Sequence, residues 1–255
     1  MPNTARLCDE NSWPKWPFAP TAPTAPTAPT APTAPTAPTP QNLKTPAFDM
    51  PLAKEDYEYF NSGVGIPWLS NFAPAEFTYE GYTWPTAEHC FQALFKVRPE
   101  HRHRFAVGGD LANLLGLKLV FPERDYEKKR KHYGAKGKRP EMPGIVAKMA
   151  VRPDIARKLG IGLTPMVEDD KHKEYMCELF RNLLLCKYRQ NEFLRSVIVG
   201  TGKKTLVEFS RGAEREAKKG KPPLWTGMVV NGEIVGQNLQ GELQMSVRSV
   251  LNDPI

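Results

Sequence analysis

The stretch of sequence from residue 169 to 199, DDKHKEYMCELFRNLLLCKYRQNEFLRSVIV, carries the strongest hydrophobic period of the chain. Four apolar side chains within it stand at positions i, i+4, i+7 and i+8: Met176, Phe180, Leu183 and Leu184. This spacing is typical of one buried face of an α-helix. We therefore expect one amphipathic helix over 169–199, ended by the polar, glycine-containing segment 200–204.

The segment on the N-terminal side of this helix predicts a hairpin followed by a second helix. Residues 77–84 read Phe-Thr-Tyr, Glu-Gly, Tyr-Thr-Trp, which is two short strands around a turn. Thr86 then has the character of a helix N-cap, and Glu88 would lie in the first turn. We expect this helix to continue to about Val97, two residues before Pro99.

The remaining elements are shorter. We expect strands at 56–60 and 205–209, a hairpin at 228–235, helices at 111–119, 154–159 and 238–251, and charged loops at 123–139 and 211–223. The fold class predicted by this pattern is α+β, a compact, helix-rich single domain with short strands over residues 49–255.

A different composition marks the first 48 residues. Twelve of the chain's 25 prolines lie within the first 50 positions, and six Thr-Ala-Pro triplets run from Thr21 to Pro38. Such a sequence offers no apolar face whose burial would offset the loss of chain entropy. We expect residues 1–48 to form a disordered, partly polyproline-like tail.

Positive charge is concentrated outside this tail. The net charge is +7, and residues 124–139 alone contain eight Lys or Arg side chains. A basic globular domain favours anionic partners such as nucleic acid. Residues 124–139 are therefore either a patch that follows a phosphate backbone or an ordinary solvated loop. Lys187 lies on the apolar side of the 169–199 helix, and we expect its ammonium group to reach water; the alternative is a lysine with a buried stem that borders a pocket.

No pattern in the sequence indicates a metal or a cofactor. The four cysteines show no C-x-x-C spacing, and His101 and His103 lie in a charged stretch. Phosphate-binding glycine motifs are also missing. We expect neither a metal nor a cofactor, no membrane span, no signal peptide, an intracellular location and a monomer.

Glu88 is the strongest candidate for catalysis. A carboxylate in the first turn of a helix faces the positive end of the helix dipole, which favours its ionised form. Gln92 is four residues later and shares its face, whereas His89 points about 100° away and is expected to be packed. The alternative for Glu88 is a purely structural interaction with the helix N-terminus.

Aromatic and glycine residues suggest where a ligand could bind. Trp84 and Trp225 either stack on a planar base or belong to the core. Glycines around Trp225 and Asn238, Gly227 among them, allow the backbone to come close to a ligand.

Several short motifs in order resemble the NADAR superfamily of YbiA-like N-glycosidases. They are Leu-Ser-Asn-Phe at 69–72, Trp-Pro-Thr-Ala-Glu-His-Cys-Phe-Gln-Ala at 84–93, Lys-Tyr-Arg-Gln-Asn at 187–191, Thr-Gly-Lys-Lys-Thr-Leu-Val-Glu at 201–208, Trp-Thr-Gly at 225–227, and the glycine- and asparagine-containing segment at 236–248. The resemblance implies a helix-rich α+β domain that acts on N-glycosidic bonds to ribose. It places the catalytic glutamate at Glu88.

The same resemblance suggests further site residues. The family's usual lysine position falls on Phe95, so Lys96, one step later, is the candidate for a catalytic lysine. Substrate-binding candidates implied by the motifs are Asn71, Phe72, Trp84, Gln92, Trp225, Gly227 and Asn238.

Three functions fit these expectations. The first is a hydrolase that removes ADP-ribose from ADP-ribosylated guanine in DNA or RNA held by the basic surface. The second is hydrolysis of a phosphoribosylamino-pyrimidine intermediate of riboflavin synthesis. The third is a non-catalytic module that binds ADP-ribose or NAD, which would not need an ionised carboxylate at the reacting position.

Overall fold

A computed structural model describes residues 53–61, 64–165 and 169–252, and the predicted tail over 1–48 lies outside them. The helices are α1 (Ala87–Lys96), α2 (Leu117–Val120), α3 (Glu123–Tyr133), α4 (Gly144–Ala150), α5 (Pro153–Lys158), α6 (Asp170–Gln190), α7 (Glu192–Gly200), α8 (Ala213–Lys218) and α9 (Leu239–Asn252). The strands are β1 (Tyr57–Phe60), β2 (Phe77–Tyr79), β3 (Tyr82–Trp84), β4 (Thr205–Glu208), β5 (Met228–Val230) and β6 (Glu233–Val235). The predicted helix-rich α+β class is confirmed.

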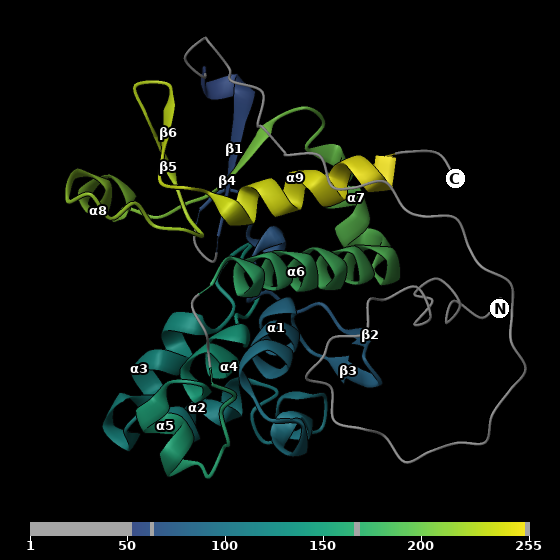
Figure 1. The fold of residues 1–255 in the computed structure, drawn as a ribbon, viewed down its shortest axis with the longest axis vertical. Coiled ribbons are helices and arrows are strands. Elements are labelled where there is room, and N and C mark those ends of the chain that lie inside the picture. The colour runs from purple at the N-terminus through teal and green to yellow at the C-terminus, as the bar shows by residue number, and fades with distance from the viewer. Residues whose placement is uncertain (1–52, 62–63, 166–168, 253–255) are drawn as a thin grey trace, which may run out of the picture.

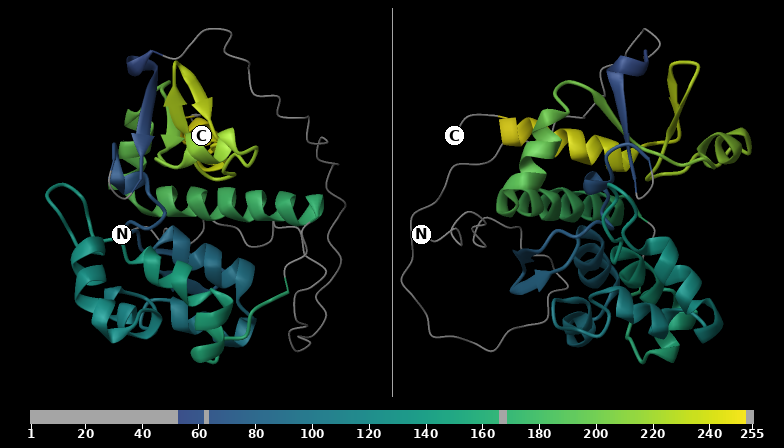
Figure 2. Two further views of the ribbon diagram at one scale, coloured as in Figure 1. Left: turned by 90° about the vertical axis from the view of Figure 1, so that its left-hand side faces the viewer. Right: turned by 180° about the vertical axis from the view of Figure 1, so that it is seen from behind.

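Helix α6 lies at the middle of the molecule. It packs against α9 on one side and against α1 on the other, and α1 in turn packs against α4 (Figure 1). Its buried face includes the four periodic apolar residues that predicted it. Seen from the side, α6 separates β1, β4, β5 and β6 from helices α1 to α5 (Figure 2).

Short strands pair in three separate two-stranded sheets. Strands β2 with β3 and β5 with β6 form the two predicted antiparallel hairpins, with Phe77 opposite Trp84 and Met228 opposite Val235. Strands β1 and β4 pair in parallel, which the sequence did not reveal because the paired positions, such as Tyr57 and Thr205, are 148 residues apart. Helix α9 packs on β4, so the C-terminal helix comes close to the end of that strand.

One predicted long helix is in fact two. The backbone of Asn191 is extended between α6 and α7, with φ −126° and ψ 96°. Its side-chain amide donates to the carbonyl oxygens of Lys187 and Glu76. Asparagine commonly competes in this way with the regular hydrogen bonds of a helix. The expectation of one helix over 169–199 was therefore wrong at this position.

Two charged segments predicted as loops contain helices. Within 123–139, residues Glu123–Tyr133 form α3, with carboxylates in its first turn and cations in its last turn, as the helix dipole favours. Within 211–223, residues Ala213–Lys218 form α8, where Lys218 pairs with Glu214 one turn earlier. Charge placed to suit the helix dipole in α3 and a charge pair in α8 are signals that a search for apolar periodicity does not detect, which explains both errors.

The predicted helix at 111–119 is shorter and partly 3-10 helical. A 3-10 helix occupies Leu114–Gly116, and α2 follows directly. Asn113 caps the 3-10 turn because its side-chain oxygen accepts the N–H of Leu115 at 2.9 Å. In the described residues, no helix is long and apolar enough to cross a lipid bilayer.

The burial of Lys187 differs from what the sequence predicted. Its side chain is completely buried, and its Nζ has no hydrogen-bond partner among the described residues. The nearest aromatic contact is the ring of Tyr188, 5.1 Å from Nζ. The expectation that this lysine reaches water was wrong, because α6 is covered on both sides by α9 and α1.

Candidate functional site

Glu88 is held at the first turn of α1 by local and long-range contacts. Thr86 is the N-cap, as predicted, and its hydroxyl accepts the N–H of His89 at 3.2 Å. The backbone N–H of Glu88 donates to the carbonyl oxygen of Asn71 at 3.0 Å. The side chain of Glu88 is buried, so its carboxyl group is fixed in position by the fold.

Gln92 lies beside this carboxyl group. Its Nε2 donates to Oε1 of Glu88 at 2.8 Å, which confirms that the two side chains share a face of α1. The Oε1 atom of Gln92 is buried and has no partner among the described residues. A buried acceptor without a donor is unfavourable, and a ligand hydroxyl or N–H group would satisfy it.

A second buried amide joins α9 to the same place. Gln240 donates from Nε2 to Oδ1 of Asn71 at 3.0 Å, while the backbone of Asn71 holds Glu88. Within the described part of the chain, Oε1 of Gln240 also lacks a partner. Two unsatisfied acceptors therefore lie close to Glu88. Gln92 on α1 contacts Glu88 directly, and Gln240 on α9 contacts Asn71, which in turn contacts Glu88. Gln240 was not predicted as a site residue, because it occupies a position within 236–248 that the motif does not specify.

Glu208, at the end of β4, is a site residue that sequence analysis did not assign. Its N–H donates to Oδ1 of Asn238 at 3.0 Å, and its carbonyl oxygen accepts the N–H of Gly227 at 2.9 Å. Asn238 also donates from Nδ2 to the carbonyl oxygen of Leu206. The predicted residues Asn238 and Gly227 thus position the backbone of Glu208. Its place in the Thr-Leu-Val-Glu motif was the available signal.

The carboxyl groups of Glu88 and Glu208 influence each other. The pKa of Glu208 is raised to about 8, chiefly by burial and also by the negative charge of Glu88, while Lys148 opposes both effects. Burial also raises the pKa of Glu88, against the lowering effects of Lys148, Gln92 and Lys96. The expectation that the helix dipole governs Glu88 was incomplete, because desolvation is the larger effect at this depth.

Two lysines influence these carboxyl groups: Lys148 acts on both, and Lys96 acts on Glu88. Lys148 on α4 is exposed and its Nζ lies 5.3 Å from the centre of the Phe72 ring. The predicted Lys96, at the end of α1, has a pKa lowered by burial and partly restored by Glu88. Nothing in the sequence around Lys148 marked it as a site residue.

Helix α4 approaches the site closely because it begins with glycine. A Cβ atom on Gly144 would lie 2.6 Å from Cα of Phe72 and 3.0 Å from Cβ of Glu88. Any larger residue would push α4 outward. Lys148, one turn along α4, depends on this contact to reach the two carboxyl groups.

The aromatic candidates separate into two kinds. Trp225 and Phe72 are half-buried, and Trp225 packs on Phe91 and Phe180 with ring centres 5.8 and 5.4 Å apart. Trp84 has no exposed surface, and its indole N–H donates to the carbonyl oxygen of Tyr79. Of the alternatives left open for Trp84, its placement matches the core.

His89 is packed, as predicted. Its ring nitrogens lie 2.8 Å from the hydroxyl of Thr86 and 2.8 Å from the carbonyl oxygen of Leu111, and burial lowers its pKa to about 4. Its ring therefore stays neutral at pH 7. Across residues 53–61, 64–165 and 169–252, no group of three His, Cys, Asp or Glu residues could hold a metal ion.

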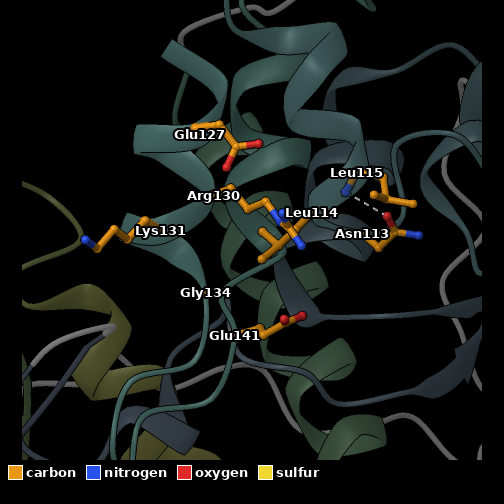
Figure 3. A pocket seen from close by; sticks show the side chains of 8 residues that line it. All are labelled: Asn113, Leu114, Leu115, Glu127, Arg130, Lys131, Gly134 and Glu141. Atoms are coloured by element: carbon orange, nitrogen blue, oxygen red, sulfur yellow. Dashed lines mark hydrogen bonds between the residues drawn. The ribbon is translucent and has the colours of Figure 1, made fainter. Parts of the chain in front are cut away.

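A pocket of about 530 Å³ lies elsewhere, between the 3-10 turn at 114–116 and α3 (Figure 3). None of the site residues predicted from the sequence lines it. Its lining residues are Asn113, Leu114, Leu115, Glu127, Arg130, Lys131, Gly134 and Glu141.

Comparison with known proteins gives a likeness in structure but none in sequence. No family model matches the chain, and no curated protein matches it in sequence. Among solved structures, the NMR structure of the Escherichia coli protein YbiA is similar, with a TM-score of 0.41 and 20% identity over 80% of this chain and 89% of that chain.

Proposed function

We propose that this protein is an N-glycosidase whose reaction centre is formed by Glu88 and Glu208. The observation that carries the proposal is the unequal pair of carboxyl groups. Glu208, with a pKa of about 8, holds a proton at neutral pH. Burial raises the pKa of Glu88 as well, but Lys148, Gln92 and Lys96 oppose this effect, and we propose that Glu88 is the carboxyl group that ionises first. A protonated and an ionised carboxyl group in one site provide an acid and a charge stabiliser for one reaction.

The two groups divide the chemistry of hydrolysis between them. As the bond from the anomeric carbon to nitrogen breaks, positive charge grows on the sugar, and ionised Glu88 stabilises it. Glu208 gives its proton to the departing nitrogen. Water then adds to the anomeric carbon and returns one proton to Glu208. The products are the free base and a sugar with an anomeric hydroxyl, and both carboxyl groups regain their starting state.

We further propose ADP-ribose attached to guanine in nucleic acid as the substrate. The NADAR-like motifs around Glu88, Trp225 and Asn238 support a ribose bond as the target. The unpartnered oxygens of Gln92 and Gln240 suit hydroxyl donors such as those of ribose. The net charge of +7 suits an anionic polymer.

A lysine offers an additional covalent route. If the ribose ring opens, its aldehyde can condense with a neutral amine to a Schiff base and release water. Burial lowers the pKa of Lys96, which increases its neutral fraction. Borohydride would trap such an adduct on the enzyme. Labelling that survives Lys148→Met and disappears in Lys96→Met assigns the role to Lys96, and no labelling in the wild type rejects the covalent route.

The direct test is release of sugar from defined substrates. Purified protein is incubated with ADP-ribosylated guanine in a single-stranded oligonucleotide, with the free modified nucleoside, and with a phosphoribosylamino-pyrimidine. We expect release of ADP-ribose from the first two, and release slower by about 10²–10⁴ in Glu88→Gln. Turnover of the pyrimidine alone would replace this substrate proposal. Binding of ADP-ribose without release from any substrate would favour a non-catalytic module.

A further inference from the structure

The pocket beside α3 lies in the most basic part of the chain. Residues 123–139 hold eight Lys or Arg side chains against three carboxylates, a net charge of +5. Most of these cations are exposed, among them Lys128, Arg130 and Lys131. In the described part of the chain, none of these three lies within ion-pair distance of a carboxylate. This face therefore keeps its positive charge available to an anionic partner.

The pocket is lined by basic, acidic, amide and apolar side chains. A site for phosphate alone would not need this mixture. Arg130 extends from α3 toward Leu114 and Asn113, whereas Lys131 extends from the other side of the helix (Figure 3). Glu127 and Glu141 add two acceptors to the lining. A guanidinium, an amide and carboxylates together match the donors and acceptors on the edge of a nucleic-acid base.

An apolar surface completes this lining. Leu115 is 66% exposed, the largest exposed fraction among the large hydrophobic residues of the described chain. The side-chain oxygen of Asn113 accepts the N–H of Leu115, which leaves the amide NH₂ of Asn113 as a donor. A planar base could cover Leu115 while its edge meets Asn113.

The pocket is connected to the reaction centre by a short piece of chain. Glu141 lines the pocket, and Gly144, three residues later, touches Phe72 and Glu88. Three residues span at most about 11 Å. A strand whose modified base lies at Glu88 would reach the pocket within a few nucleotides.

We propose that this pocket is a base-binding subsite for an unmodified nucleotide that flanks the modified one in a single-stranded nucleic acid. The base covers Leu115, its edge meets Asn113 and the carboxylates, and the phosphates run along Lys128, Arg130 and Lys131. Arginine planes and apolar side chains commonly stack on bases in this way. The inference rests on the proposed function in its choice of nucleic acid as the partner.

The test measures binding without catalysis. Fluorescence anisotropy follows a labelled, unmodified single-stranded DNA oligonucleotide as it binds the full chain. We expect Arg130→Ala to weaken binding about tenfold and Leu115→Ser about fivefold, the range of single base contacts. Leu115→Ser should leave the salt dependence of binding unchanged, since no phosphate contact is lost. Arg189→Ala, at the distant end of α6, removes the same charge and should have little effect.

Different outcomes separate this inference from the proposed function. If Arg130→Ala and Arg189→Ala weaken binding equally and Leu115→Ser has no effect, only diffuse attraction exists and the subsite is rejected. If the wild type hydrolyses modified nucleoside but binds no oligonucleotide, the subsite fails and the N-glycosidase proposal stands. If it binds oligonucleotide in the expected variant order but hydrolyses nothing, the subsite stands and the N-glycosidase proposal fails. Melting curves establish that each surface variant is folded.

Discussion

The Glu88 region and the α3 pocket represent opposite ways of using charge. In the Glu88 region, one carboxyl group is buried and the other, that of Glu208, is half-buried, and contacts from the Asn71 backbone and the Asn238 side chain fix their elements. At the α3 pocket, cations are exposed and unpaired within the described chain. Burial shifts the pKa of Glu208 to about 8, whereas exposure leaves the cations of α3 in contact with water and salt. The first region suits chemistry, and the second suits attraction of a polymer.

The sharpest way to break this contrast is to remove the charge of Glu88. Glu88→Gln keeps the size of the side chain and the hydrogen bond from Gln92, but it removes the negative charge that would stabilise positive charge on the sugar. We expect turnover to fall by about 10²–10⁴, with oligonucleotide binding unchanged. Glu242→Gln on α9 is the matched control. Near wild-type turnover in a folded Glu88→Gln protein would reduce Glu88 to a structural residue at the helix start.

Glu208→Gln tests the second carboxyl group through pH dependence. Glu208 must carry a proton to act as an acid, and it does so below its pKa of about 8. Wild-type turnover should therefore fall about tenfold per pH unit well above pH 8. Glu208→Gln should lose about 10² in rate and should lack this alkaline decline. An alkaline decline that persists unchanged in the variant assigns it to another group.

How well the sequence predicted each region depends on how far apart along the chain the contacting residues are. Glu88, Gln92 and the Thr86 cap belong to one helical turn, so local spacing was enough to place them. Glu208 and Lys148 meet Glu88 only through the parallel pairing of β1 with β4 and the packing of α4 on α1. The hydrophobic periodicity of the sequence does not indicate those contacts.

The limits of a local sequence pattern also explain the errors made at the surface and in the core. The charge of residues 124–139 was visible by counting, yet α3 was missed because a helix made almost entirely of charged residues has no apolar period. Asn191 interrupts the long helix through a hydrogen bond to Glu76, more than 100 residues away. Burial of Lys187 likewise required knowledge of what covers α6.

Lys187 extends the contrast to a buried amine that the proposed reaction does not use. Burial lowers the pKa of Lys187 from 10.5 to about 7. The folded state therefore binds fewer protons than the unfolded state between pH 7 and 10.5, and stability rises with pH across that window by up to about 1.4 kcal/mol per unit. Below pH 7 the full cost remains.

Replacing this lysine should therefore stabilise the fold. Lys187→Met keeps the length of the side chain and removes the buried charge, and we expect about 2 kcal/mol of added stability at pH 7. The dependence on pH between 7 and 9 should become flatter. Urea unfolding at both pH values measures the effect, with exposed Lys173→Met on the same helix as the control. Destabilisation by Lys187→Met would indicate that the amine has a partner that matters.

The smallest expected effect concerns the aromatic edge of the reaction centre. Trp225 is half-buried on Phe91 and Phe180, so one part of its ring supports the core and another part is accessible. Loss of stacking on a base or of packing against ribose should weaken substrate binding about tenfold in Trp225→Ala. Trp225→Phe keeps an aromatic face and should recover most of the affinity. Calorimetric titration with ADP-ribose separates binding from turnover, and a melting curve reports the packing contribution. If both variants melt earlier yet bind ADP-ribose as the wild type does, Trp225 serves only the core, and the contact with substrate must come from the other half-buried ring, Phe72.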